Sequence, residues 1–469
     1  MQGVNPGSQS GLATGISLRP RAHPSQNLLL RAGAILLVLS AVSQQLLYMQ
    51  TGLSGLGLPG MGLLYTARHS WLILASVGCA LIFLSPASLR QLRPSMRLWF
   101  GLLMTYIVFL SIYGMLRGVD TRILLWNSII YFVFAAGIVV GSQSINWSML
   151  HTYFHHALVL GAIWLILLLL ASPVALAEVE AIRNLPRFGP DEYPLLAASM
   201  GGQMQISCFP IVLLMLHQVS RQRRATGIAA LVMVLALFML FGKRAPFARL
   251  VVFALIFVSW ILAARGVVLF RVSRLVPVLG SLIILVVSSG LLVNLLGGVD
   301  VLERAGIHLA DRFQNIGEES RSVGVVGADR FVEIGYLFEA FSGLEYLVGR
   351  GMGGGFSTPT SWHPGIILMD GGTSIYGVHT PHIGLAGPLV KGGIPFTCVF
   401  FYGWVKAIWS PGSPDVNRKL RPYRGVLSVS LLFMAVETLM GVTSMPSTLM
   451  LAVCVGRCLA VNPFGDPTQ

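Results

Sequence analysis

A short segment between two apolar runs carries three cations: Lys243, Arg244 and Arg249 in GKRAPFARL (242–250). Arginine binds phosphate through two parallel N–H···O hydrogen bonds, and lysine acts on the same group as a point charge. Cations at the start of a helix meet the positive end of its macrodipole, so an anion is expected to offset them. The segment therefore favours a docking site for a lipid phosphate or diphosphate. The alternative is that these side chains only reach toward lipid headgroups.

Two histidines stand where a long polar connection meets the next apolar run. They are His379 and His382 in VHTPH (378–382). An imidazole titrates near neutral pH, so it can accept a proton from a hydroxyl group or orient that group. On spacing alone, the better interpretation is a pair of interfacial histidines satisfied by water or backbone. A zinc site that includes His363 lacks an evident third or fourth ligand.

The polar connection itself contains two further segments of interest. Arg330 opens RFVEIGYLFEAFSGLEYLV (330–348), whose apolar residues recur at helical spacing. This spacing predicts an amphipathic helix lying on the membrane or on the helical bundle. The glycine-rich GRGMGGGF (349–356) follows, without the strand, helix start and Lys-Ser/Thr end of a Walker loop. We expect it to be a turn whose backbone approaches a ligand or another helix.

The composition places these segments in a membrane protein. Of 469 residues, 55% are hydrophobic and only 11% are charged, whereas a soluble domain carries roughly 25% charged residues. The net charge of +14 comes from short basic clusters between apolar runs. That pattern is typical of cytoplasmic loops and argues against a nucleic-acid partner. Cys454 and Cys458 lack His or carboxylate neighbours, so we interpret them as small buried hydrophobes.

The apolar runs predict an all-α fold, a polytopic membrane helical bundle of about twelve spans, because a span needs about 20 apolar residues. The runs lie near 30–49, 70–87, 97–116, 123–141, 153–177, 194–217, 226–241, 247–264, 276–296, 384–405, 425–441 and 446–461. The predicted organisation is a disordered cytoplasmic arm (1–27), a first part of the bundle (28–296), a large, partly helical periplasmic loop (297–382), a second part of the bundle (383–461) and a cytoplasmic tail (462–469).

Charge predicts the orientation of this bundle. If the amino terminus is cytoplasmic, the basic clusters that include Arg31, Arg93, Arg221, Arg271 and Arg421 all fall inside. The opposite orientation would put nearly all of them on the wrong side. The chosen topology makes the connection 297–382 periplasmic, in a bacterial inner membrane. It also places the Lys243–Arg244 segment and both histidines at the outer face, where one site could use them together.

In this order and sidedness, three segments resemble the bacterial O-antigen ligase and polysaccharide polymerase superfamily. GKRAPFARL (242–250) is similar to the family's Ser-Arg-Gly segment, with Arg244 on its arginine and Lys243 in place of the serine. ADRFVEIGYLFEAFSGLEYLVGRGMGGGF (328–356) resembles the family's arginine, amphipathic helix and Gly-x-Gly run, with Arg330 as the motif arginine.

The third segment is VHTPHIGLAGPLVKGGIP (378–395), which resembles a His-Pro-His-Asn motif followed by an acidic residue and a glycine. His382 and Gly393 fit that spacing. Two positions depart from the pattern: Ile383 replaces the Asn, and Lys391 stands where an acid is common.

The resemblance implies an integral membrane glycosyltransferase without metal or cofactor. Its donor would be an undecaprenyl-diphosphate-linked glycan, and its acceptor a hydroxyl of a second sugar or of lipid A core. Polysaccharide-assembly proteins are candidate partners. The implied roles are catalysis for His382 and Arg330, an accessory role for His379, and lipid-diphosphate binding for Arg244, Lys243 and Arg249. Polymerase and ligase remain open, and the alternatives are a transporter or flippase of a lipid-linked or anionic solute and a non-catalytic scaffold.

Overall fold

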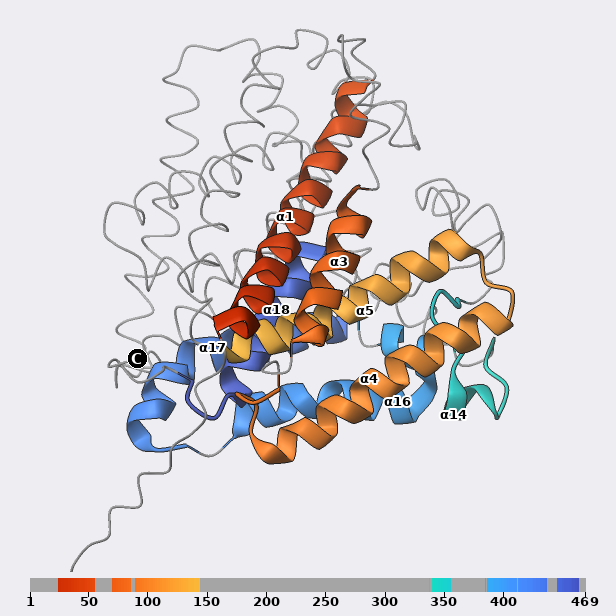
Figure 1. Cartoon of the computed structure of the whole chain (residues 1–469). Coiled ribbons are helices and arrows are strands. Elements are labelled where there is room, and N and C mark those ends of the chain that lie inside the picture. The colour runs from red at the N-terminus through yellow and green to blue at the C-terminus, as the bar shows by residue number, and fades with distance from the viewer. Residues whose placement is uncertain are drawn as a thin grey trace, which may run out of the picture.

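The computed structural model describes residues 24–54, 70–85, 89–143, 337, 340–355, 384, 386–410, 412–436 and 445–463. These residues are mainly helical and contain no strand, only an isolated bridge between Leu92 and Ala460. The helices are α1 (Pro24–Ser54), α3 (Ser70–Leu84), α4 (Pro94–Leu116), α5 (Thr121–Ser142), α14 (Glu345–Val348), α16 (Ala386–Trp409), α17 (Pro414–Val436) and α18 (Met445–Leu459), shown in Figure 1. The predicted all-α class is confirmed for this part of the chain.

Two helices are long and apolar enough to cross a membrane, Pro94–Leu116 and Ile123–Ser142. They coincide with the spans predicted at 97–116 and 123–141, and they favour a membrane protein. Shorter apolar helices occupy Leu28–Ala41, Ser70–Leu84 and Thr448–Leu459. The spans predicted between 153 and 296 lie outside the described residues.

Two predicted boundaries differ from the structure. Helix α1 already begins at Pro24, inside the arm predicted for 1–27. Helix α17 begins at Pro414, well before the span predicted at 425–441, so the basic cluster around Arg421 is helical. Its start follows a recognisable signal, because proline suits the first helical turn and Asp415 complements the macrodipole there.

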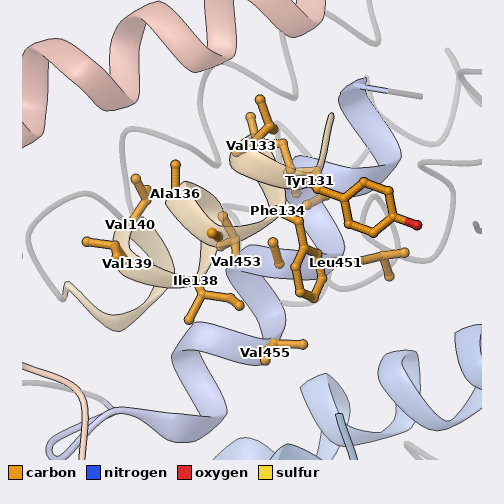
Figure 2. Close-up of a cluster of buried hydrophobic side chains, with 14 of the residues drawn as sticks. Tyr131, Val133, Phe134, Ala136, Ile138, Val139, Val140, Leu451, Val453 and Val455 are labelled. Atoms are coloured by element: carbon orange, nitrogen blue, oxygen red, sulfur yellow. The ribbon is translucent and has the colours of Figure 1, made fainter. Parts of the chain in front are cut away.

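Helices α5 and α18 pack through glycines. A Cβ atom added to Gly141 would lie 2.1 Å from the carbonyl oxygen of Val453, and one added to Gly456 would lie 2.0 Å from the carbonyl oxygen of Ile138. Buried aliphatic side chains of both helices fill the surrounding space (Figure 2). Small residues let helices approach closely in lipid, where packing rather than the hydrophobic effect drives association.

Helices α1 and α3 form a second close pair, running antiparallel. A Cβ atom on Gly33 would lie 2.8 Å from the carbonyl oxygen of Gly78. Farther along, the Ser40 hydroxyl donates a hydrogen bond to the Trp71 carbonyl at 2.6 Å. The pair is tied to the rest of the bundle because the Gln44 side-chain oxygen accepts a 2.8 Å hydrogen bond from the backbone N–H of Met445, at the start of α18.

Aromatic side chains join α5 to α16. The Tyr131 ring lies 5.6 Å from Phe396 and 5.8 Å from Phe400, measured between ring centroids. Phe134 lies 4.8 Å from Phe400 and stacks on Trp404 at 6.1 Å. All five side chains are buried. Since such pairs add to the energy of burial, these rings tie α16 to the middle of α5.

Arg93 connects the ends of several helices through hydrogen bonds. Its backbone N–H donates to the Leu459 carbonyl at 3.3 Å, and its guanidinium donates to the Ala460 carbonyl at 3.4 Å and to the Ser410 hydroxyl. Arg424 of α17 donates to the Ser410 carbonyl at 2.8 Å. We call this the Arg93 end of the bundle. Helices α4 and α16 run antiparallel from it to the opposite end, where Gly114, Gly351 and Lys391 meet; we call that the loop end.

The glycine contact between α5 and α18 predicts a large effect of Gly141→Leu. The added side chain would have to displace the Val453 backbone, and overpacking of this kind costs about 1–3 kcal/mol. The purified variant should unfold at a lower temperature in detergent, or fail to accumulate. Gly101→Leu is the matched control, because a Cβ atom there meets nothing within 4 Å. Equal losses in both variants would contradict this account of the packing.

Candidate functional site

The residues predicted to carry chemistry lie outside the described residues. They are Lys243, Arg244, Arg249, Arg330, His379 and His382. The structure describes the framework that adjoins two of them along the chain. Residues 340–355 follow Arg330, and residues 384 and 386–409 follow His382. If one site uses both Arg330 and His382, residues 340–355 and the start of α16 are expected to lie in contact.

They meet at the loop end of the bundle, through the backbone of the glycine-rich segment. The N–H of Arg350 donates to the Val390 carbonyl at 2.8 Å, and the N–H of Gly351 donates to the Lys391 carbonyl at 2.9 Å. The next N–H, of Met352, donates to the Leu110 carbonyl of α4 at 2.9 Å. The segment is thus a turn that approaches other helices, as predicted. These N–H groups are already used and do not cradle a phosphate.

A break in α16 creates the acceptors for this contact. Gly392 and Gly393 have non-helical backbone angles, and the helix resumes before Pro395. In an unbroken helix the Lys391 carbonyl would pair with the N–H four residues later, but that residue is Pro395, which has none. The N–H of Gly351 takes its place. Thr397 completes the restart by donating its hydroxyl to the Gly393 carbonyl at 2.8 Å.

Glycine is required on both sides of the contact. Gly349 has φ +71°, and a Cβ atom there would lie 2.5 Å from the carbonyl of Lys391. Gly393 has φ +66°, and a Cβ atom there would lie 2.5 Å from the Tyr346 carbonyl oxygen. Both conformations are strained for other residues. The sequence analysis missed the helix break, although the run Gly392–Pro395 carries its signal.

Arg350 closes the segment on itself. Its guanidinium binds the Glu345 carboxylate in a bidentate manner, with distances of 3.1 and 3.0 Å. It also donates to the Gly355 carbonyl at 2.8 Å and to the Ala340 carbonyl, and it lies 5.2 Å from the centre of the Phe341 ring. One half-buried side chain thereby holds both ends of residues 340–355.

Glu345 links this segment to the turn between α4 and α5. Arg117 of that turn donates to Glu345 Oε1 at 3.4 Å, and Figure 1 shows α14 beside the same turn. Partial burial acts to raise the pKa of the Glu345 carboxyl. Hydrogen bonds from Arg350, Ser342 and Arg117 outweigh it, so the pKa lies below its ordinary value.

The predicted amphipathic helix Arg330–Val348 is wrong at its carboxyl end. Leu337 and Ala340 are helical, but residues 341–344 leave the helix before α14 begins. Two residues explain the interruption. Gly343 is costly inside a helix, and the N–H of Ser342 donates to the Glu345 carboxylate at 3.0 Å instead of to a helical carbonyl.

Lys391 has an unusual environment for a cation. The residue is only 5% exposed, and within the described ranges its ammonium group has neither a hydrogen bond nor an ion pair. At the same end of the bundle, Arg350 and Arg117 share the carboxylate of Glu345. In the sequence, Lys391 stands out only because it replaces the acidic residue expected in the motif at 378–395. Its burial depends on how the loop packs and is not visible in the residue pattern.

No gathering of metal ligands accompanies this framework. Among the described residues, no group of three His, Cys, Asp or Glu side chains could hold a metal ion. Cys454 and Cys458 are free and buried, which confirms their interpretation as small core residues. The described residues of the loop end contribute positive charge and backbone held in a fixed position.

Comparison with known proteins found no match to a family model, a curated protein or a solved structure. The motifs in the sequence and the geometry of the loop end are therefore the observations that bear on the function of the chain.

The first prediction for this site concerns Gly349. Gly349→Ala should displace residues 349–355 from α16. The methyl group would overlap the Lys391 carbonyl, and alanine is strained at the positive φ of this position. Met352, fully buried beside α4, provides a reporter. With the native cysteines replaced, Met352→Cys should resist a water-soluble maleimide and become reactive when Gly349→Ala is added. Gly343→Ala, at an open position, should leave it protected; equal labelling in both backgrounds would refute the docking.

The second concerns Glu345. Its folded pKa lies below its unfolded value, so its stabilisation is present above the unfolded pKa of about 4.3 and is lost as pH falls through the folded pKa. Glu345→Gln should lower the unfolding temperature at pH 7, since a hydrogen bond to a charged group contributes about 1.5–3 kcal/mol. The difference from wild type should shrink as the pH falls below about 4. Asp415→Asn, exposed on α17, controls for loss of a carboxylate.

Proposed function

We propose that the chain is an integral membrane glycosyltransferase of the O-antigen ligase or polysaccharide polymerase type. It would transfer a glycan from an undecaprenyl-diphosphate carrier to a sugar hydroxyl at the periplasmic face. The observation that supports this most is the docking of Gly349–Gly355 on the break in α16. The contact joins the segment that begins at Arg330 to the segment that begins at His379, as one shared site requires.

The two ends of the bundle support the proposed orientation. Residues near Arg93 and Arg424, expected in the cytoplasm, meet at one end. Residues 340–355 and the start of α16, expected outside, meet at the other. We propose accordingly that the amino terminus is cytoplasmic and that the connection 297–382 is periplasmic, in a bacterial inner membrane with about twelve spans.

In the proposed reaction, an acceptor hydroxyl attacks the anomeric carbon of the donor. A new C–O bond forms, the C–O bond to the diphosphate breaks, and the lipid diphosphate leaves with the electron pair. His382 takes the hydroxyl proton or orients the hydroxyl, with His379 as its accessory. Arg330 stabilises the developing negative charge, and Arg244, Lys243 and Arg249 bind the diphosphate. Holding donor and acceptor together supplies much of the rate.

A transporter or flippase is the second candidate, because such proteins use broken helices and buried charges. The break in α16 and the burial of Lys391 are features of that kind. However, the break lies close to the amino-terminal end of α16, whereas transporters bind their solute near the middle of the bilayer. Conversion of a lipid-linked oligosaccharide by purified protein in detergent, without a gradient, would exclude pure transport.

Variants of Arg244 and His382 test the proposed function. Arg244→Ala and His382→Ala should each abolish the surface polysaccharide while the amount of protein in the membrane stays normal. His217→Ala, at the predicted cytoplasmic end of a span, should leave the polysaccharide unchanged. Wild-type glycan from both site variants would end the assignment of catalysis to these residues.

A deletion strain separates the two enzyme types. Single repeat units that accumulate on the lipid carrier indicate a polymerase, and long chains on the carrier indicate a ligase.

A further inference from the structure

Lys391 carries a positive charge at the loop end that has no ionic partner among the described residues. Two other cations there, Arg117 and Arg350, share the carboxylate of Glu345. No partner of the Lys391 ammonium occurs in the part of the chain that the structure describes. A largely buried ion without a partner is unfavourable, so this arrangement calls for an anion.

Two ordinary explanations for Lys391 fit poorly. A lysine that reaches out to the membrane surface keeps its ammonium exposed, but this residue is only 5% exposed. A lysine that caps a helix end would donate to carbonyl oxygens. The carbonyl groups freed by the break, those of Val390 and Lys391, receive their hydrogen bonds from the loop N–H groups of Arg350 and Gly351.

The position of Lys391 relates it to the proposed reaction. The first segment of α16 runs from Ala386, shortly after His382, to Lys391 at the break. At 1.5 Å per residue this segment is about 8 Å long. A second helical segment starts just after Gly393, and the start of a helix favours anions. The break therefore places a buried cation and a helix start together, nine residues along the chain from the proposed catalytic histidine, His382.

We propose that Lys391 binds an anionic oxygen group of the substrate, either a phosphate of the lipid diphosphate or a carboxylate of an acidic sugar. This inference rests on the proposed function and adds a specificity residue to it. The substrate supplies the counterion that the described residues do not, so binding is favoured by relief of an unpaired charge. A neutral glycan without its lipid diphosphate would gain nothing from Lys391.

Binding measurements on the purified full-length protein test the inference. The probes are undecaprenyl diphosphate, undecaprenol and a glucuronate-containing oligosaccharide. Lys391→Met should weaken one of the two anionic probes at least about ten-fold, which corresponds to about 1.4 kcal/mol. Loss for undecaprenyl diphosphate identifies the phosphate, and loss for the oligosaccharide identifies the carboxylate. Undecaprenol should bind equally to both proteins, and Lys391→Arg should restore most of the affinity.

The unfolding temperature of the protein without ligand tests independently whether the Lys391 ammonium lacks a partner. Lys391→Met should raise the unfolding temperature, because it removes an unpaired buried charge. Lys406→Met, an exposed lysine on the same helix, is the matched control and should change neither stability nor binding. A lower unfolding temperature for Lys391→Met would show that the ammonium already has a partner in the protein, and would overturn the proposal. Unchanged binding of both anionic probes would overturn it as well.

The inference and the proposed function can fail separately. If Lys391→Met weakens an anionic probe but the wild-type protein transfers no glycan in detergent, the binding role stands and the glycosyltransferase proposal fails. If the wild-type protein transfers glycan and Lys391→Met binds and transfers equally well, only the role of Lys391 fails.

Discussion

Pro395 has no N–H, and the organisation of the loop end follows from that single missing donor. The carbonyl of Lys391 cannot be satisfied inside its own helix. Water cannot satisfy it either, because residues 390–393 are buried, and a buried backbone group needs a partner within the protein. The segment Gly349–Gly355 supplies both the cover and the hydrogen bonds. A distant part of the chain thus becomes a structural component of α16.

This constraint also explains the composition of the covering segment. Its N–H groups reach the carbonyls of α16 and α4 only if the backbones are in contact. Gly349 therefore carries no side chain against α16, and Gly351 carries none against Gly114 of α4. The intervening Arg350 turns back onto Glu345 and fixes the shape of the segment. Lys391, at the same contact, is buried and has no counterion among the described residues.

The sequence was informative where one local signal decides the structure. Apolar runs predicted α4 and α5 closely, and the glycine-rich segment was correctly expected to approach another helix. Prediction failed where local signals compete. Helical periodicity continued through Ser342 and Gly343, but backbone preferences ended the helix there. The start of α17 at Pro414 was missed because its basic residues resemble a loop. The burial of Lys391 depends on a partner far away in sequence, which no local pattern records.

The same contact suggests how two large substrates could be aligned without a rigid extracellular domain. If the connection 297–382 is periplasmic and carries a catalytic group, as proposed, holding that group in place costs conformational entropy. Each point at which the connection is fixed to the bundle lowers that cost. The docked segment is such a point between Arg330 and His379. If catalysis depends on positioning, the glycines of the contact should matter to the reaction although none of them carries a reactive group. Their effect would act through the geometry of the site, and it would be largest for the groups nearest to the break in α16.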